Sequence, residues 1–281
     1  MDIRLIALDL DGTLLNSEKQ LTARNYRALE RAHAAGVHIV PTTGRFYNLL
    51  PEVIRTLPFM RYAITINGAA VFDLQEKKTL AAAEIPPEEA VEIMAYLDGF
   101  DVIYDCYTGN AGYMTERLQN MARLYAGNPH CYAMLRDFRK PVPELKDFVW
   151  TGGQGIQKIQ MYVKPENLAL RSFLMEELGR RFPDLAVSSA FFNNIELNQS
   201  HANKGEALLA LAAALGLKRE QTMSFGDGLN DLSMIRAAGF GVAMANGEQA
   251  TLDVADYICE SCDEDGVART IEKFILGEEG N

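Results

Sequence analysis

The feature that most constrains the fold is a mostly apolar run, residues 3–8, that ends in Asp9-Leu10-Asp11-Gly12-Thr13. A parallel strand covered on both faces reads as nearly continuous hydrophobics, and ligands in such sheets bind beyond the carboxyl ends of the strands. The run therefore predicts a buried strand. It also places the carboxylates of Asp9 and Asp11 where an active site is expected.

Strand and helix patterns alternate along both ends of the chain. A helix over 22–35, with Thr22 as N-cap and Gly36 after its end, lies between the strands 3–8 and 37–40. This order is typical of a parallel sheet with crossover helices. The same reasoning predicts a helix over 46–57, a strand over 62–66, a helix over 204–215, a strand over 222–225, a helix from about 229, a strand over 241–243 and a helix over 266–276.

The middle of the chain has a different pattern. It begins at Pro86-Pro87, which is typical of the first turn of a helix, and its strands over 101–107 and 156–163 alternate more clearly. We therefore expect an α/β protein with a Rossmann-like parallel-sheet core interrupted by one α+β insertion. The predicted boundaries are 1–83 plus 191–281 for the core and 84–190 for the insertion.

Composition excludes several classes of partner. The 27 Lys and Arg against 38 Asp and Glu give a formal charge of −11, which argues against binding to nucleic acid or to anionic membranes. The apolar stretches are too short for a signal peptide or a membrane span, so we expect a cytoplasmic protein. Cys259 and Cys262 form a C-x-x-C without the further ligands that zinc needs, which favours unligated thiols.

Asp9 and Asp11 could have two different chemical roles. One carboxylate could attack an electrophile while its neighbour transfers protons, provided that their environments differ. Gly12 invites a turn directly after Asp11, so the spacing alone leaves their geometry open. A solvated turn is the alternative interpretation.

A second acidic group, Gly226-Asp227-Gly228-Leu229-Asn230-Asp231, follows a predicted strand and opens a helix. Carboxylate oxygens are the ligands that Mg²⁺ takes in proteins, so this segment is a candidate magnesium site. Helix capping by Asp227 or Asn230 is the alternative, and both roles could hold together.

Two further segments suit an anion. Thr43, Gly44 and Arg45 follow a strand and precede a predicted helix, where hydroxyl, backbone N–H and guanidinium donors favour phosphate. Lys204 lies at another predicted helix start, where a cation is disfavoured unless an anion accompanies it. A solvated surface lysine is the alternative for Lys204.

These segments together resemble a known family. D-L-D-G-T at 9–13, T-G-R at 43–45, Lys204 and G-D-G-L-N-D at 226–231, in that order, resemble the haloacid dehalogenase superfamily. The segments that are similar to its Cof-type phosphatases are Asn67-Gly68-Ala69, the insertion after it, Ala243-Met244-Ala245-Asn246 and Asp265-Gly266-Val267-Ala268.

The resemblance implies a phosphoaspartate mechanism with an inserted cap domain over the site. Asp9 would attack phosphorus, and Asp11 would protonate the leaving group and then activate water. Mg²⁺ would be held by Asp9, Asp227 and the backbone carbonyl of Asp11. The resemblance further implies phosphate binding by Thr43, Gly44, Arg45, Lys204 and Asn230, with Asp231 and Asn67 in supporting roles.

The function expected from these residues is a Mg²⁺-dependent phosphatase for small phosphorylated metabolites such as sugar phosphates or phosphorylated cofactors. One alternative is a phosphomutase of the same superfamily, and another is a non-catalytic, regulatory phosphate-binding protein. The sequence names neither the substrate nor the oligomeric state.

Overall fold

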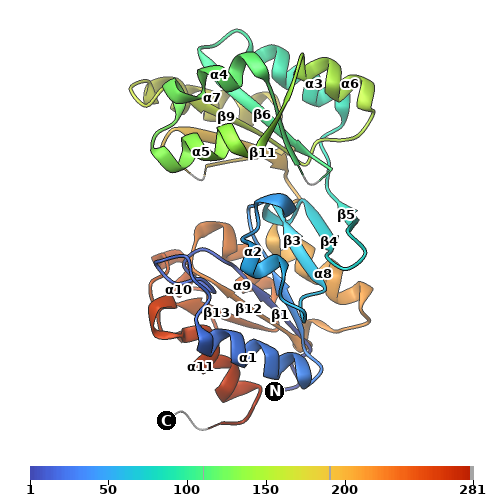
Figure 1. Cartoon of the computed structure of the whole chain (residues 1–281), viewed down its shortest axis with the longest axis vertical. Helices are drawn as coiled ribbons and strands as arrows, with labels where there is room; N and C mark the ends of the chain where they lie inside the picture. The colour runs from blue at the N-terminus through green and yellow to red at the C-terminus, as the bar shows by residue number, and fades with distance from the viewer. Residues whose placement is uncertain (110, 190, 279–281) are drawn as a thin grey trace. The chain divides into compact units, whose positions relative to one another are not determined.

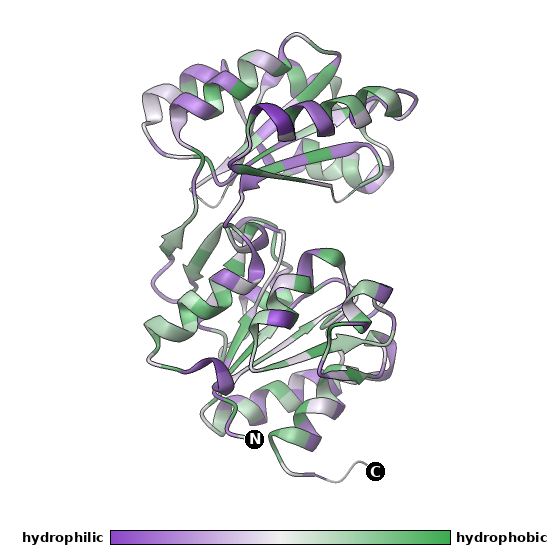
Figure 2. Ribbon diagram, turned by 180° about the vertical axis from the view of Figure 1, so that it is seen from behind, coloured by the Kyte–Doolittle hydropathy of each residue, from purple (hydrophilic) through white to green (hydrophobic). Residues whose placement is uncertain are grey.

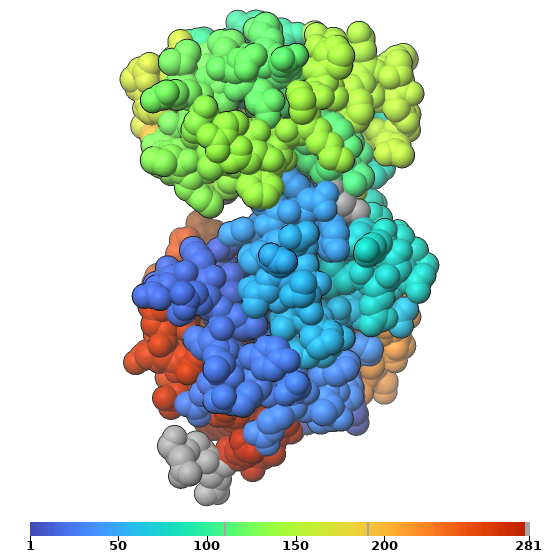
Figure 3. All heavy atoms as spheres, in the orientation of Figure 1, coloured from blue at the N-terminus to red at the C-terminus, as the bar shows by residue number. Residues whose placement is uncertain are grey.

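The computed structural model describes residues 1–109, 111–189 and 191–278, which form two compact units. The first consists of Met1–Arg45, Leu50–Ala81 and the chain from Ala202 onward, and the second of Phe46–Leu49 and Ala82–His201. Position 190, at the boundary predicted for the insertion, and positions 279–281 lie outside the described residues. Within the first unit, atoms from the beginning and the end of the chain lie side by side (Figure 3).

A five-stranded parallel sheet forms the centre of the first unit (Figure 1). Its strands, in spatial order, are β14 (Tyr257–Cys259), β13 (Phe240–Met244), β12 (Thr222–Gly226), β1 (Leu5–Leu8) and β2 (His38–Pro41). Every residue of β1 is fully buried, because β1 lies between β12 and β2 and is covered on both faces. Figure 2 shows these strands largely in green, the colour of hydrophobic residues. The predicted Rossmann-like parallel sheet is confirmed.

The helices of the first unit pack on this sheet. Leu5 and Ala7 of β1 share a buried cluster with Leu208 and Leu211 of α8 and Met234 of α9. The helix predicted over 22–35 is α1, and its N-cap is Thr22, whose hydroxyl accepts the N–H of Asn25. Outside residues 46–82, the helical elements of this unit are α1 (Ala23–Ala34), α8 (Lys204–Ala214), η3 (Arg219–Gln221), η4 (Leu229–Asp231), α9 (Leu232–Ala237), α10 (Gln249–Leu252), η5 (Cys262–Glu264) and α11 (Gly266–Phe274).

The helix predicted over 46–57 is wrong. The segment forms two short pieces, η1 (Tyr47–Leu49) and α2 (Glu52–Arg55), which are separated at Pro51. Pro51 has an extended ψ of 141° and cannot donate a helical hydrogen bond, so no continuous helix passes through it. A small sheet follows, with the order β3 (Tyr62–Thr65), β4 (Ala70–Asp73) and β5 (Lys78–Ala82), and η2 (Ile66–Gly68) connects its first two strands.

The second unit contains a six-stranded mixed sheet. Its strands, in spatial order, are β10 (Leu185–Ser188), β11 (Asn194–Gln199), β9 (Lys158–Val163), β6 (Val102–Thr108), β7 (Ala111–Thr115) and β8 (Arg139–Val142). Residues 191–201, which we assigned to the core from the sequence, belong to this unit, because β11 pairs with both β9 and β10. Ile195 and Leu197 of β11 contribute to its hydrophobic core.

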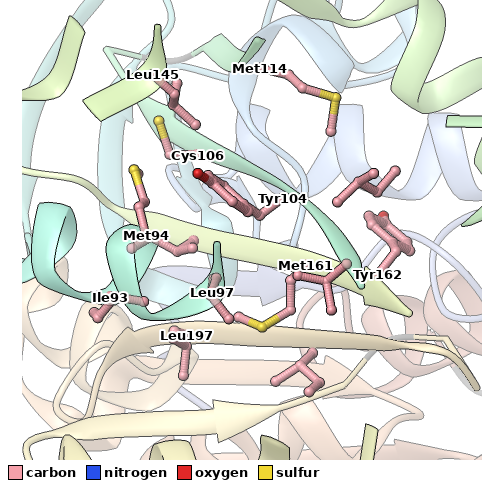
Figure 4. Close-up of a cluster of buried hydrophobic side chains, with 14 of the residues drawn as sticks. Ile93, Met94, Leu97, Tyr104, Cys106, Met114, Leu145, Met161, Tyr162 and Leu197 are labelled. Carbon is pink, nitrogen blue, oxygen red and sulfur yellow. The ribbon is translucent and has the colours of Figure 1, made fainter. Parts of the chain in front are cut away.

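Helices cover the hydrophobic core of the second unit. They are α3 (Pro87–Leu97), α4 (Glu116–Tyr125), α5 (Pro129–Asp137), α6 (Leu145–Gly152) and α7 (Leu168–Arg181). Figure 4 shows Met94 and Leu97 of α3 beside Tyr104 and Cys106 of β6 and Met161 of β9. Within the described ranges, the structure contains no helix with both the length and the apolar content needed to cross a membrane.

Candidate active site

Asp9 and Asp11 follow the end of β1, and their side chains lie in different environments. The backbone N–H of Asp9 continues the strand by donating to the carbonyl of Phe225 at 3.0 Å, and its side chain is buried. Gly12 then turns the chain with a φ of +89°, and a Cβ atom on Gly12 would lie only 2.5 Å from Oδ2 of Asp227. The structure thus settles the geometry that the sequence left open: Asp9 is buried, whereas the side chain of Asp11 is 34% exposed.

Asp227 lies at the end of β12, directly beside the end of β1. Neighbouring parallel strands bring their carboxyl ends to one edge of a sheet. This explains why Thr13 and Asp227, which are 214 positions apart in the sequence, meet here. Thr13 Oγ1 donates to Asp227 Oδ1 at 2.8 Å. Burial is the main cause that raises the pKa of Asp227, and the hydrogen bond from Thr13 opposes it.

Lys204 is fully buried at the start of α8, where the helix dipole disfavours a cation. Its Nζ donates to Oδ1 of Asp9 and to Oδ1 of Asp231, each at 2.6 Å. Burial alone would lower the pKa of Lys204, but Asp231 and Asp9 outweigh it and raise that pKa above its ordinary value. Lys204 is therefore a buried ammonium held by two carboxylates, and the solvated alternative is wrong.

Asp231 connects Lys204 to the loop that follows β12. Its Oδ2 accepts the backbone N–H groups of Asp227 at 3.0 Å and Gly228 at 2.9 Å, while its Oδ1 accepts from Lys204. One carboxylate therefore fixes the conformation of the loop and the position of the ammonium.

Carboxylate oxygens of Asp9, Asp227 and Asp231 all lie within 4.8 Å of one another. Burial, the largest cause, raises the pKa of Asp9 to about 7; the Lys204 ammonium lowers it, and the Asp231 and Asp227 carboxylates add to the rise. One ammonium among three carboxylates leaves an excess of negative charge that a divalent cation would relieve. Hard oxygen donors in this arrangement fit Mg²⁺.

Thr43, Gly44 and Arg45 follow β2 and bring donors to the same edge. The N–H of Arg45 donates to Thr43 Oγ1 at 3.3 Å. The Arg45 guanidinium holds both oxygens of Asp11, with Nε at 3.0 Å and Nη2 at 2.8 Å from Oδ2, and Nη2 at 3.0 Å from Oδ1. The α-helix expected directly after this loop is absent, because the short η1 follows it and α2 begins only at Glu52.

Asn67 connects this loop to the loop after β12. Its N–H donates to the carbonyl of Thr43 at 3.0 Å, and its Oδ1 accepts from Nδ2 of Asn230 at 3.4 Å. The next residue, Gly68, has a φ of +97°, and a Cβ atom there would lie 2.2 Å from the carbonyl oxygen of Asn203. Only glycine permits this close approach to the residue that precedes Lys204.

The structure brings every predicted site residue into one region of the first unit, and it adds partners that the sequence analysis missed. Lys19 Nζ lies 3.1 Å from Asp11 Oδ1. Thr13 contacts Asp227, as described above, and Asn246 Nδ2 donates to the carbonyl of Gly12 at 2.8 Å. Asp9, Asp11 and Asp227 follow predicted strands, whereas Lys19 belongs to a polar loop that carries no such signal. Cys259 and Cys262 are free thiols outside the acidic cluster.

Comparisons with known proteins match almost the whole chain. A family model described as haloacid dehalogenase-like hydrolase matches residues 6–271. The phosphatase YwpJ of Bacillus subtilis (strain 168) is 31% identical over 97% of this chain and 100% of its own length. The 5-amino-6-(5-phospho-D-ribitylamino)uracil phosphatase YcsE of the same organism is 31% identical over 98% of this chain and 97% of its own.

A solved structure gives the same answer at the level of the fold. The crystal structure of a haloacid dehalogenase-like hydrolase from Bacteroides thetaiotaomicron has a TM-score of 0.80 and 27% identity, and the match covers 97% of this chain and 100% of that one.

Proposed function

Because the chain belongs to the haloacid dehalogenase-like hydrolase family and is a phosphatase of its Cof type, we propose that it hydrolyses phosphate monoesters of small metabolites through an aspartyl phosphate on Asp9. The observation that carries this proposal is the buried contact between Asp9 and Lys204 at 2.6 Å, at the end of the central strand. A carboxylate beside a fixed ammonium can approach an anionic phosphate that would otherwise repel it.

The proposed reaction has two steps. In the first, a carboxylate oxygen of Asp9 bonds to phosphorus, the ester P–O bond breaks, and Asp11 gives a proton to the departing oxygen. In the second, water attacks the same phosphorus, its proton passes to Asp11, and the bond between phosphorus and the Asp9 oxygen breaks. Phosphoryl transfer depends mainly on positioning and on charge stabilisation, which buried and fixed groups supply.

We assign the remaining residues to the phosphoryl group and the metal. Thr43, Gly44, Lys204 and Asn230 would bind phosphate oxygens, and Arg45 would join them. Asp231 and Asn67 would hold these groups in place through the hydrogen bonds described above. Asp9, Asp227 and the backbone carbonyl of Asp11 would hold Mg²⁺, which when bound supplies the positive charge that offsets the crowding of carboxylates and phosphate.

The substrate class rests on the relatives. YcsE is named as a phosphatase of a phosphorylated ribityl-aminouracil, and this supports a small phosphorylated metabolite for the present chain. We further propose that the second unit acts as a cap that contacts the non-phosphate part of the substrate. A cytoplasmic location, expected from the composition, is part of the same proposal.

The test is a panel of phosphate monoesters assayed for free phosphate with Mg²⁺, with EDTA, and with Asp9→Asn. Turnover should require Mg²⁺ and should disappear in Asp9→Asn, because amide nitrogen and oxygen cannot replace the attacking carboxylate. Activity retained by Asp9→Asn would exclude the aspartyl phosphate. An isomerised product in place of free phosphate would favour the phosphomutase alternative, and no reaction with any ester would favour the regulatory one.

Asp11→Asn provides the matched control for the metal. It should slow the reaction while Mg²⁺ still binds through Asp9 and Asp227, because the proposed ligand from Asp11 is its backbone carbonyl. Equal loss of Mg²⁺ binding in Asp9→Asn and Asp11→Asn would contradict these separate roles.

A further inference from the structure

Lys19 is a cation at the candidate active site, and it lies outside all the motifs described in the sequence analysis. Its Nζ lies 3.1 Å from Asp11 Oδ1, and its side chain is 59% exposed. Arg45 and Lys204 are also cations at the site, but they are part of the segments discussed above, and Lys204 is fully buried. Lys19 therefore differs from them in both its origin and its environment.

The loop that carries Lys19 is held in one conformation by hydrogen bonds. The N–H of Lys19 donates to the carbonyl of Asn16 at 2.9 Å, and the N–H of Gln20 donates to Oδ1 of Asn16 at 2.8 Å. The N–H of Ser17 donates to Oδ1 of Asp263 at 2.9 Å, which joins the loop to a residue 246 positions later in the sequence. Lys19 itself has a φ of +61°, which is unfavourable for a residue with a side chain. The fold thus maintains a strained backbone that presents this ammonium to Asp11.

The contacts of Arg45 suggest why Asp11 needs a second partner. Arg45 holds both oxygens of Asp11, and it follows Thr43 and Gly44 in the proposed phosphate loop. A guanidinium binds a phosphate in the same two-point manner as it binds a carboxylate. A substrate phosphate therefore competes with Asp11 for Arg45, and Asp11 would lose its two-point partner when substrate binds.

We infer that Lys19 is a positioning residue for Asp11. It holds Oδ1 in place when Arg45 binds the substrate phosphate instead of Asp11, so that Oδ2 stays directed at the departing oxygen. Lys19 Nζ lies 3.1 Å from Oδ1, so it restrains the carboxylate through that oxygen. This inference rests on the proposed function, in which Asp11 gives its proton to the leaving group as the ester P–O bond breaks.

The experiment compares two esters that differ in their need for that proton. Glycerol phosphate releases an alkoxide, which must be protonated, whereas p-nitrophenyl phosphate releases a stable phenolate, which need not be. The value of kcat/KM reports only the steps up to departure of the leaving group, so water attack on the aspartyl phosphate does not enter it. Lys19→Met, Lys19→Arg and the wild type are each assayed with both esters.

The matched control is Lys77→Met. Lys77 is also an exposed lysine of the first unit with a positive φ, 52°, and it lies in the turn between β4 and β5. Its substitution removes the same charge and tests the same kind of backbone strain. It should leave kcat/KM unchanged for both esters.

Lys19→Met should lower kcat/KM about tenfold for glycerol phosphate and less than about twofold for p-nitrophenyl phosphate, because a misplaced acid slows only the departure that needs a proton. Lys19→Arg should restore most of the loss. An equal loss with both esters would show that Lys19 acts on folding or on attraction of the anion, and no loss with either would show that it has no role; both results overturn the inference.

The same assays separate this inference from the proposed function. If the wild type hydrolyses both esters and Asp9→Asn hydrolyses neither, the proposed function holds and the ester comparison alone decides the role of Lys19. If Asp9→Asn remains active, the proposed function fails, and the inference about Lys19 fails with it.

Discussion

The ammonium of Lys204 donates to the carboxylate of Asp231 at 2.6 Å, in a place where the two side chains are 0% and 1% exposed. The same carboxylate accepts two backbone N–H groups from the loop that begins at Asp227. Asp231 therefore determines two things at once, the position of a buried cation and the shape of the loop that carries the candidate metal ligand.

Replacing Asp231 should affect stability as well as turnover. Asp231→Ala removes one of the two carboxylate partners of a buried ammonium and leaves loop N–H groups unpaired, so the free energy of unfolding should fall by about 3–5 kcal/mol. Asp231→Asn keeps an oxygen acceptor and should lose clearly less. Urea denaturation of the two variants measures the difference, and equal stability of Asp231→Ala and wild type would contradict this role.

Thr13 orients Asp227 through the 2.8 Å hydrogen bond from its hydroxyl. Thr13→Val keeps the shape of the side chain but removes the donor, and loss of such a partner behind a metal ligand lowers metal affinity about 10–100-fold. Thr13→Ser keeps the donor and should bind Mg²⁺ nearly as well as wild type. A Mg²⁺ titration followed by calorimetry checks both, and unchanged affinity in Thr13→Val would show that this hydrogen bond does not matter for the metal.

Gly68 permits the close approach of two loops, and its matched control is Gly216. Gly68→Ala would place a Cβ atom 2.2 Å from the carbonyl oxygen of Asn203, in addition to the strain of a φ of +97°. Gly216 has a φ of +72° with no atom within 4 Å, so Gly216→Ala carries the strain alone, about 1–2 kcal/mol. Gly68→Ala should be less stable than Gly216→Ala in urea and should lose turnover. The prediction fails if the two variants behave alike.

The sequence predicted the central strand and the acidic groups because their signals are local. The buried strand before Asp9 reads as a run of apolar residues, and Asp227 follows a second such run. The carboxyl ends of parallel strands collect at one edge of a sheet, so both acids were expected near an active site. The family resemblance gave Lys204 a role in the same site, but its direct contacts with Asp9 and Asp231 are seen only in the structure, because no spacing in the sequence indicates which segments are neighbours.

Three features were missed or predicted wrongly, each for a different reason. Lys19 contacts Asp11 from a loop in which its own φ is +61°, and composition does not reveal such a backbone conformation. β11 alternates polar and apolar residues, as the predicted strands of the insertion do, so the assignment of residues 191–201 to the core overlooked a local signal that the pairing with β9 makes plain. The helix predicted over 46–57 is an error of another kind, since the apolar periodicity was given more weight than Pro51.

The second unit contains a buried ion pair whose loss should be costly. Arg139 Nε donates to Asp105 Oδ2 at 2.9 Å, and both side chains are 0% exposed. Among the described residues, Asp105 Oδ1 and Arg139 Nη1 have no further hydrogen-bond partner. Arg139→Met would leave the Asp105 carboxylate buried without its cation, so the free energy of unfolding should fall by about 3–5 kcal/mol.

Two variants control this prediction, each measured by urea denaturation. The double variant Asp105→Leu/Arg139→Met removes both charges and should recover most of the lost stability, because apolar side chains of similar volume can replace a buried pair. Arg136→Met removes an exposed arginine paired with Asp137 and should leave stability almost unchanged. If the double variant were as unstable as Arg139→Met, the loss would come from packing and not from the unpaired charge.

Asp101 should make the stability of the second unit depend on pH. A hydrogen bond from Lys164, with Nζ at 2.7 Å from Oδ2, is the main cause that lowers the pKa of Asp101 below its ordinary value of 3.8, and a hydrogen bond from Tyr125 adds to it. A carboxyl whose pKa is lower in the folded state stabilises the fold above its unfolded pKa, and this contribution is lost as the pH falls through the folded value. Asp101→Asn should therefore melt at a lower temperature than wild type at neutral pH, by a small margin because the pair is exposed.

This difference in melting temperature should shrink as the pH falls below the ordinary pKa of Asp101, and it should vanish once wild-type Asp101 is protonated. Lys164→Met should remove the same pH-dependent part, because it takes away the main cause of the shift. Thermal unfolding of the three proteins across this pH range measures it, and a margin that stays constant into acid would mean that the charge of Asp101 contributes nothing.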